Sequence, residues 1–346
     1  MSREAAFTSE LIRSSSRGLA GQTVALFYTR ASSPEARYGD DGFESWRKTI
    51  AARFDALAGA LDANDPAIFA EDLTWFRGLS GARGVPEDDL ALVLDCMGEM
   101  VSERLPEEAG AATAEYFAKA IAALKQSIPG SPGLDAGSLA EQLFELALVG
   151  DLQGCRNLLA DGVRGNRFSL EEAIVNGVLP AARETGRRWH SGEISIATEH
   201  VVTSTLRHAL HNLASVLPLP KPNGKAAFLA AVPGDAHDTG LLALSVLLEH
   251  DGWRIAMAGA DTPVEEVDAA AEAYDCDLIA LSATLPSQRH ALISYLRERE
   301  IEIPVLIGGS AVRDQDDALA IGAAGVAKTL TDGLLFARRI VGLPAV

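Results

Sequence analysis

Five short apolar runs alternate with helical segments after residue 224, and this alternation is the feature that most restricts the fold. The runs cover residues 226–232, 254–258, 278–282, 305–307 and 325–327. Helical segments follow them, starting near Thr239, Pro263, Pro286 and Asp314, with a last one after Leu330. Strands that alternate with helices form a parallel sheet covered on both faces. We therefore predict an α/β fold with a doubly wound, flavodoxin-like parallel sheet.

The chain before this sheet carries the apolar spacing of helices. Between residues 43 and 127, Asn64-Asp65-Pro66 separates two of four predicted helices, with Asp65 as N-cap and Pro66 at the first helical position. Four helices of this length favour an antiparallel bundle. A linker-like stretch, Ser-Ile-Pro-Gly-Ser-Pro-Gly, occupies residues 127–133 and precedes a second helical set that ends at Pro218.

These patterns predict four segments. Residues 1–40 are weakly patterned, with at most a short strand at 23–29, and we expect them to be mobile. We expect an all-α bundle over 41–128, which would bind a protein partner, mediate dimerisation or hold a second chromophore. A four-helix cap follows over 135–217, and the sheet domain occupies 224–346.

Charge and composition exclude several classes of protein. The formal net charge is -18, and residues 35–130 hold 18 acidic against 9 basic side chains. Because nucleic-acid binding needs a basic face, we expect no direct DNA binding. The three cysteines are widely separated, which fits a reducing cytoplasm. No apolar run reaches the length of a membrane span, so we expect a cytoplasmic protein without membrane contact.

One motif follows the first predicted strand, Gly234-Asp235-Ala236-His237-Asp238-Thr239-Gly240. In an open parallel sheet, ligands bind beyond the carboxyl ends of the strands, where His237 would lie. Asp235 is placed to accept a hydrogen bond from one imidazole nitrogen, which leaves the other for a metal. Two later strand ends carry small residues, which would leave a slot beside the sheet: Ser282-Ala283-Thr284-Leu285 and Gly308-Gly309-Ser310.

The spacing Asp-x-His-x-x-Gly resembles the cobalamin-binding domain of the methionine-synthase type, over residues 225–340. The alternative is a chance match on a response-regulator-like sheet. The resemblance implies that His237 replaces the dimethylbenzimidazole of the cofactor below cobalt, a base-off/His-on arrangement. It also implies that the displaced nucleotide tail fills the slot. The cofactor-binding residues of this half would be Asp235, His237, Asp238, Gly240, Ser282, Thr284, Leu285, Gly308 and Gly309.

A second motif lies in the predicted cap, with Trp189-His190 followed by Glu199-His200. Methyl-carrying corrinoid proteins present an apolar helix start at this place, whereas this chain has Ala197-Thr198-Glu199-His200. The motif resembles the cobalamin-dependent photoreceptors of the CarH type. That resemblance implies that Trp189, Ile196, Glu199 and His200 contact an adenosyl group above cobalt. It further implies that His190 becomes the upper cobalt ligand after light has removed this group.

We therefore predict a light-sensing, non-enzymatic protein that binds adenosylcobalamin, or methylcobalamin, and responds by a change in cap packing. The helical N-terminal layout, which has no basic recognition helix, is similar to that of cobalamin photoreceptors that also bind a bilin. This resemblance implies biliverdin as a second chromophore, with seven aromatic residues of the bundle as a candidate lining: Trp46, Phe54, Phe69, Trp75, Phe76, Tyr116 and Phe117. The ordinary interpretation of such a set is a bundle core. A homo-oligomer, with a dimer favoured, and a protein signalling partner are the expected partners.

Two alternatives stay open at this point. The chain would be a corrinoid methyl carrier serving a methyltransferase if the upper face held a methyl group. It would be a light-independent cobalamin sensor if the bound cofactor did not respond to light. A mutase subunit is the weaker interpretation, because no substrate barrel is evident in the chain.

Overall fold

The computed structural model describes residues 3–126, 133–218 and 220–344. The chain divides into two compact units, Met1–Gly130 and Ser131–Val346. Residues 127–132 of the expected linker lie outside the described residues. Among the described residues, no helix is both long and apolar enough to cross a membrane.

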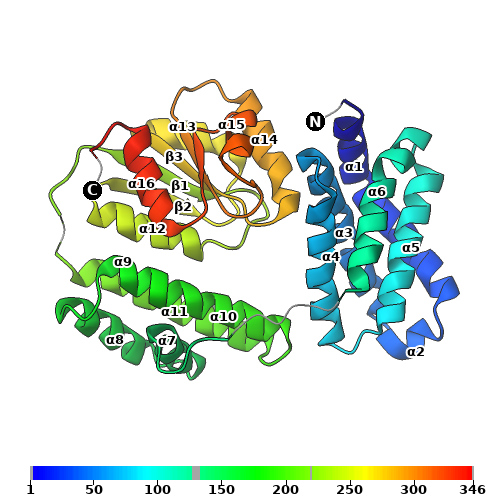
Figure 1. Ribbon diagram of the computed structural model, residues 1–346, viewed down its shortest axis with the longest axis horizontal. Helices are drawn as coiled ribbons and strands as arrows, with labels where there is room; N and C mark the ends of the chain where they lie inside the picture. Colours follow the sequence, from blue (N-terminus) through cyan, green and yellow to red (C-terminus); the bar gives the residue numbers. More distant parts are fainter. Residues whose placement is uncertain (1–2, 127–132, 219, 345–346) are drawn as a thin grey trace. The chain divides into compact units, whose positions relative to one another are not determined.

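Over residues 3–126, the first unit consists of helices and the turns between them (Figure 1). Its helices are α1 (Arg3–Arg30), α2 (Pro34–Tyr38), α3 (Gly42–Ala63), α4 (Pro66–Gly81), α5 (Glu87–Arg104) and α6 (Glu107–Leu124). Helix α4 begins as predicted, because the Asp65 side chain accepts a hydrogen bond from the Ala67 amide at 2.9 Å. The seven aromatic residues mostly fill the core of this unit: five are buried, Phe76 is partly buried and Trp75 is exposed.

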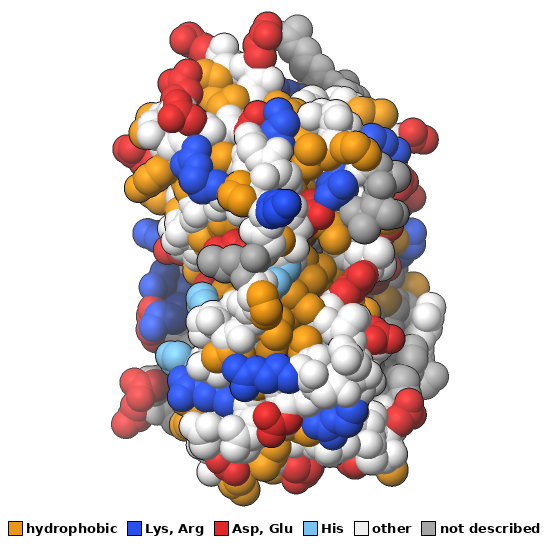
Figure 2. All heavy atoms as spheres, turned by 90° about the vertical axis from the view of Figure 1, so that its left-hand side faces the viewer, with side chains coloured by type: hydrophobic (Ala, Val, Ile, Leu, Met, Phe, Trp, Pro, Cys, Tyr) orange, Lys and Arg blue, Asp and Glu red, His pale blue; other side chains and the backbone are white. Residues whose placement is uncertain are grey.

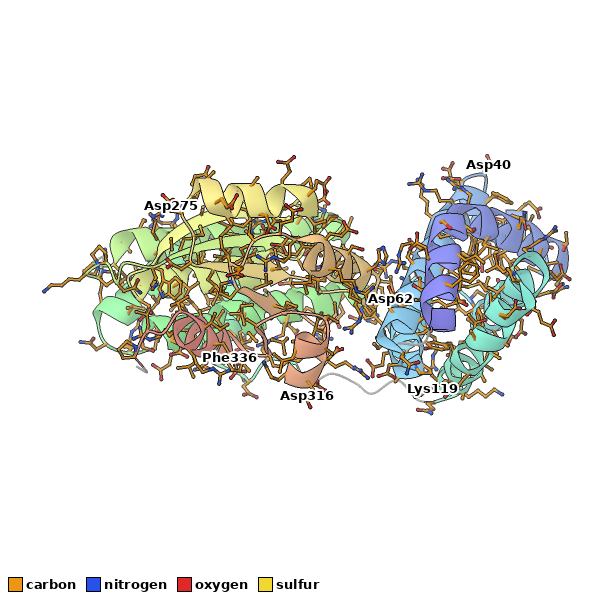
Figure 3. All side chains as sticks on the ribbon, turned by 90° about the horizontal axis from the view of Figure 1, so that it is seen from above. Asp40, Asp62, Lys119, Asp275, Asp316 and Phe336 are labelled. Carbon is orange, nitrogen blue, oxygen red and sulfur yellow. The ribbon has the colours of Figure 1, made fainter. Side chains whose placement is uncertain are left out.

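The prediction of a mobile segment over residues 1–40 is wrong. Helix α1 runs through most of it, including the place of the expected strand, and packs against α3. Ile12, Leu19 and Phe27 bury their side chains in the bundle core. Asp62, labelled on α3 in Figure 3, accepts hydrogen bonds from Ser9 and Arg13 of α1, each at 2.6 Å. The apolar residues of α1 recur at helical spacing. The serines and arginines between them lower the average hydrophobicity, which is why the sequence analysis did not predict this helix.

The second unit begins with the helical cap. Its helices are α7 (Leu139–Leu148), α8 (Leu152–Arg164), α9 (Leu170–Ala173), α10 (Leu179–His190) and α11 (Ile196–Val216). A π-helical turn, η1 (Ile174–Val178), joins α9 to α10. Pro180 has no N–H to donate within the helix, and the Leu179 amide reaches back to the Ile174 carbonyl instead.

A five-stranded parallel sheet follows the cap, as predicted. Its strands are β1 (Ala226–Ala231), β2 (Arg254–Gly259), β3 (Leu278–Ser282), β4 (Val305–Gly308) and β5 (Gly325–Ala327). Their order is β2-β1-β3-β4-β5, the flavodoxin-like order. Because β2 and β3 lie on opposite sides of β1, the chain leaves β1 and β3 in different directions. Ligands of such sheets bind in the crevice that results, beyond the strand ends.

Helices cover both faces of the sheet. They are α12 (Thr239–His250), α13 (Val267–Ala273), α14 (Arg289–Glu298), α15 (Gln315–Ala320) and α16 (Leu330–Ile340), with short 3-10 turns η2 (Val264–Glu266) and η3 (Pro286–Gln288). Helices α12 and α16 share one apolar core with the sheet, and α13 to α15 share another. Helix α12 also packs against the cap, since its Leu242 and Val246 belong to one core with Leu206 and Leu210 of α11. Figure 1 shows α12 between the sheet and α11.

A buried ion pair holds α14 to α15, and it gives a first prediction. Arg289 donates to both carboxylate oxygens of Asp317, at 2.8 and 2.5 Å. The Asp317→Asn substitution leaves the guanidinium buried without a counter-charge, so we expect the free energy of unfolding to fall by roughly 3 kcal/mol. Urea unfolding measures this loss. Asp316→Asn, at the exposed neighbouring position labelled in Figure 3, is the control and should change stability little.

The pH dependence of this loss has a definite sign. Burial alone would raise the pKa of Asp317, but hydrogen bonds from Arg289 and from the Arg313 amide hold the pKa below its usual value. The stabilisation is therefore complete above the pKa of the unfolded chain, about 3.9, and is lost as the pH falls through the folded pKa. An Asp317→Asn variant whose stability deficit stays constant from pH 7 down to about pH 3 contradicts this assignment.

Candidate functional site

The loop between β1 and α12 places His237 beside a buried carboxylate. Asp235 is fully buried, and its Oδ1 accepts from the His237 amide and from His237 Nδ1, both at 3.0 Å. Its Oδ2 accepts from the Thr284 amide at 2.9 Å. Since an ionised carboxylate only accepts, Nδ1 donates the proton of this hydrogen bond, and in the neutral imidazole Nε2 keeps its lone pair. The His237 side chain is 61% exposed.

Electrostatics make this imidazole a good electron donor. Burial alone would raise the pKa of Asp235, but hydrogen bonds from His237 and Thr284 hold it below its usual value. The hydrogen bond with Asp235 raises the pKa of His237, burial opposes this, and the charges of Glu199 and Asp238 add to the increase. A more basic nitrogen binds a metal more strongly. Glu199 of the cap is thus close enough for its charge to act on His237.

Gln288 joins the loop after β3 to the loop after β1. This buried side chain accepts hydrogen bonds from the Thr284 and Leu285 amides at 2.7 and 2.8 Å, and donates to the Gly234 carbonyl at 3.0 Å. The sequence analysis did not find Gln288, because its partner Gly234 lies 54 residues away. The two loops on either side of the crevice are therefore held in fixed positions.

Small residues shape the remaining strand ends as expected. Gly309 has a φ of +95°, and a Cβ there would lie 2.2 Å from the Ala283 carbonyl oxygen, so only glycine fits. Gly308 is half-buried and Ser282 is buried at the ends of β4 and β3. A Cβ on Gly240 would meet nothing within 4 Å, which leaves open space at the start of α12.

The cap residues of the second motif lie at the junction of α10 and α11. Trp189 and His190 end α10 and are half-buried, whereas Ile196 begins α11 and is exposed. Glu199 Oε2 lies 2.6 Å from His200 Nδ1, and Glu199 Oε1 accepts from the Thr203 hydroxyl at 2.8 Å. Both α10 and α11 contact α12, the helix that follows His237.

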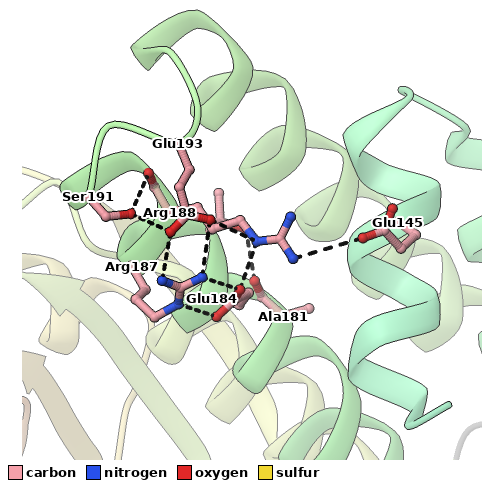
Figure 4. A network of polar contacts seen from close by, with 8 residues as sticks. Glu145, Ala181, Glu184, Arg187, Arg188, Ser191 and Glu193 are labelled. Carbon is pink, nitrogen blue, oxygen red and sulfur yellow. Dashed lines mark hydrogen bonds and ion pairs between the residues drawn. The ribbon is translucent and has the colours of Figure 1, made fainter. Parts of the chain in front are cut away.

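A charged network fixes the turn after His190 (Figure 4). The buried carboxylate of Glu184 accepts from Arg187 at 2.7 and 2.8 Å and from Arg188 at 2.8 Å. Glu193, beyond the turn, accepts from Arg187 at 2.9 Å and from Ser191 at 2.7 Å. The sequence analysis did not identify this network, although the acidic and basic residues stand at helical spacing. The network determines where α10 ends and hence where Trp189 and His190 lie.

Comparison with known proteins gives the class of ligand. Residues 226–334 match the B12 binding domain, and residues 139–214 match a second model with the same description. Both ranges lie in the unit Ser131–Val346 and cover the sheet and the cap. The two matches support cobalamin as the cofactor of this unit.

The relatives include proteins of two kinds. The HTH-type transcriptional repressors CarA and CarH of Myxococcus xanthus are 34% and 32% identical over 157 and 153 residues, which are 44% and 41% of this chain. The chain spans about half the length of these two relatives, 52% and 48%. Dimethylamine corrinoid protein 1 of Methanosarcina acetivorans is 26% identical over 178 residues, 49% of this chain and 83% of its own.

A solved structure supports the fold. The monomethylamine corrinoid protein of Methanosarcina barkeri superposes with a TM-score of 0.50 and 18% identity, over 58% of this chain and 98% of its own. At that identity the likeness concerns the architecture, a parallel sheet with helices around it.

The relatives also correct one expectation. We expected no direct DNA binding, and the similarity to two proteins named as transcriptional repressors contradicts this. The expectation was based on net charge, which averages over a region and does not describe a local surface. On the face drawn in Figure 2, for example, Lys and Arg side chains lie interspersed with Asp and Glu.

Proposed function

We propose that this protein is a cobalamin-dependent light sensor that binds adenosylcobalamin between its cap and its sheet, base-off and with His237 as the lower ligand. The observation that carries the proposal is the Asp235–His237 pair, in which Nδ1 bonds the carboxylate and Nε2 is left for a metal. Glu199 of the cap acts on the same imidazole, which supports a cofactor position between the two. The similarity to CarA and CarH favours a sensor over other cobalamin proteins.

The residues present fit this cofactor. A neutral imidazole whose other nitrogen bonds a carboxylate is a usual donor to a transition metal. Bare backbone at Gly240, where a Cβ would meet nothing within 4 Å, admits a large ring system close to the start of α12. On the tail side we assign Ser282, Thr284, Leu285, Gly308 and Gly309 as lining residues. On the upper side we assign Trp189, Ile196, Glu199 and His200, with Asp235, Asp238 and Gly240 below.

Adenosylcobalamin supplies a cobalt–carbon bond that visible light cleaves. The contribution of the chain is to hold the upper group and to respond when it leaves. Trp189 and the Glu199–His200 pair stand at the junction of α10 and α11, so their contacts with the upper group connect its presence to cap packing. His190 ends α10 and offers a second imidazole for the upper position. The output is a change in helix packing, so we propose a non-enzymatic role.

The corrinoid relatives support one alternative, a methyl carrier with methylcobalamin as its cofactor. The polar pair Glu199–His200 argues against it, because a methyl group offers no hydrogen-bond partner to polar side chains. A light-independent adenosylcobalamin sensor is the other alternative.

Absorption spectra before and after green light distinguish these functions. The protein is loaded with adenosylcobalamin in the dark, and we expect illumination to give a stable spectrum of cobalt with two histidine ligands. A bound cofactor whose spectrum does not change on illumination, or a methyl group transferable to a thiol, moves the protein to one of the alternatives. A preparation that binds no cobalamin contradicts the proposal as a whole.

The orientation of His237 gives a second prediction. Asp235→Asn replaces an obligate acceptor by an amide, which no longer fixes the imidazole tautomer, so we expect cobalamin affinity to fall roughly 10- to 100-fold. Titration with cobalamin, followed by absorbance, measures this. The control is Asp277→Asn, which loses a carboxylate at the opposite end of β1, where it bonds Lys225 and the Ala226 amide. Equal affinities of the two variants would contradict the role of Asp235.

Biliverdin remains part of the proposal as a second ligand of the unit Met1–Gly130. That unit has a small apolar pocket whose lining includes Ile50, Phe76 and Met97 together with Arg53. Arg53 stacks on Phe76 at 4.8 Å and pairs with Asp72 at 2.9 Å. The space has a volume of about 10 Å³, so binding of biliverdin requires these side chains to move apart. Mixing the protein with biliverdin should give a shifted red absorption band, and an unchanged spectrum excludes this ligand.

A further inference from the structure

One charged contact joins the cap directly to the loop that carries His237. Arg207 of α11 donates from Nη2 to Asp238 Oδ2 at 2.8 Å, across 31 residues of sequence. Asp238 directly follows His237. Another polar contact between cap and sheet domain runs between Glu171, which is half-buried, and Thr331, which is exposed.

Asp238 is held in an unusual way for its position. It is the N-cap residue of α12, yet its side chain makes no capping hydrogen bond. An N-cap aspartate normally accepts from an amide in the first turn of its own helix. Here the carboxylate accepts from the cap instead. The Asp238 side chain is 7% exposed and the Arg207 side chain 39%. A buried carboxylate is costly without a partner, so Asp238 depends on Arg207 more than Arg207 depends on Asp238.

Arg207 also belongs to the cap face that carries Glu199. Glu199, Thr203 and Arg207 follow each other at four-residue spacing, which places them on one face of α11. Two helical turns, roughly 12 Å, separate the first from the third. Glu199 and Asp238 both act electrostatically on His237. One face of α11 therefore carries both Glu199, whose charge acts on the His237 imidazole, and Arg207, which binds the next residue of the same loop, Asp238.

We propose that Arg207 is a positioning residue that couples the cap to the lower ligand. Its ion pair with Asp238 keeps the His237 loop in a fixed position relative to α11. This inference rests on the proposed function and assigns the route by which cap and imidazole affect each other. When α11 moves away, Asp238 loses its counter-charge next to His237. The coupling acts in both directions. If packing of α11 against the loop increases the affinity of His237 for the metal, metal binding must stabilise that packing by the same free energy.

A set of four variants tests the inference in the full chain: Arg207→Ala, Arg207→Lys, Asp238→Asn and the double variant Arg207→Ala with Asp238→Asn. We expect Arg207→Ala to weaken cobalamin binding about tenfold, because it leaves Asp238 charged and unpaired. Asp238→Asn removes the buried charge and should weaken binding only about threefold. The double variant should resemble Asp238→Asn, so that the second substitution rescues the first. Lysine should restore most of the affinity, since a single guanidinium nitrogen makes the contact.

Two readouts separate a positioning role from a general loss of stability. Cobalamin affinity is measured together with the fraction of bound cofactor that shows histidine ligation in its spectrum, which should fall in Arg207→Ala only. Thr331→Ala, which removes the hydrogen bond between Thr331 and Glu171 of the cap, is the matched control and should keep wild-type affinity and spectrum. If Arg207→Ala does not fold, the cobalamin affinities of Asp238→Asn and the double variant can still be compared, because neither variant leaves a buried charge unpaired.

The possible outcomes distinguish this inference from the function on which it rests. If wild-type protein binds no cobalamin, the proposed function fails. If wild-type protein binds cobalamin with histidine ligation and Arg207→Ala binds it equally well, only the inference fails. Losses that add in the double variant contradict it too, since they mean that the two residues act independently.

Discussion

Replacing His237 by alanine is expected to lower cobalamin affinity by more than roughly 100-fold, the largest effect that we predict. Substitutions in the residues that orient a metal ligand cost about 10- to 100-fold, and removing the ligand itself should cost more. The reason is structural, because Asp235 fixes Nδ1 as the donor and leaves Nε2 of this imidazole for the metal. Any cofactor that still binds should keep its own nucleotide base on cobalt. Equilibrium titration and the absorption spectrum of the bound form measure both effects.

The control for this substitution is His211→Ala. His211 is exposed on α11, outside the residues assigned to the site. Its variant should bind cobalamin as the wild type does. Wild-type affinity in His237→Ala would mean that the Asp235–His237 pair has another purpose and that the cofactor binds elsewhere.

The second large effect concerns light. His190→Ala should bind adenosylcobalamin in the dark within about threefold of wild type, since His190 has no role in the dark site that we propose. After illumination, however, it should fail to reach the stable spectrum of cobalt with two histidine ligands. Illuminated wild-type protein should retain that spectrum for hours in the dark. The measurement is a spectral time course after a single light pulse.

A matched control exists on the neighbouring helix. The Nδ1 atom of His208 lies 2.7 Å from the Ser204 carbonyl oxygen of its own helix, so His208→Ala removes an imidazole without removing the one that we assign. This variant should give the wild-type photoproduct. Should His190→Ala give it as well, His190 is not the upper ligand, and the comparison with CarH-type photoreceptors does not extend to this residue.

The sequence predicted the sheet and its ligand loop for a clear physical reason. Buried parallel strands are continuous apolar runs, and their carboxyl ends lie on one edge of the sheet. The Asp-x-His spacing is local, so both residues necessarily share one loop. Their hydrogen bond could thus be expected before any coordinates were known.

Contacts between distant segments were not predictable in this way. Gln288 bonds Gly234 across 54 residues, and Arg207 bonds Asp238 across 31. Asp238 illustrates the problem well. Its position before α12 indicates an ordinary N-cap, yet in the folded chain its carboxylate is bonded to the cap. No local pattern in the sequence distinguishes these two arrangements.

The N-terminal unit shows another limit of sequence patterns. Helix α1 was missed because its buried residues are separated by serines and arginines, which lower the apolar signal without interrupting the helical spacing. The expectation that the protein does not bind DNA was wrong for a related reason. It was based on the net charge of a whole region, whereas a few basic residues are enough to form a local binding surface.

The measurement that tests the central claim most directly is electron paramagnetic resonance of the protein loaded with cobalamin and reduced to the cobalt(II) state. The protein is prepared with histidine labelled with ¹⁵N at the ring nitrogens and bound to unlabelled cofactor. If His237 is the lower ligand, each cobalt line splits into two, because one ¹⁵N nucleus with spin one half is bound. A three-fold splitting from ¹⁴N would show that the cofactor keeps its own base, and it would contradict the account.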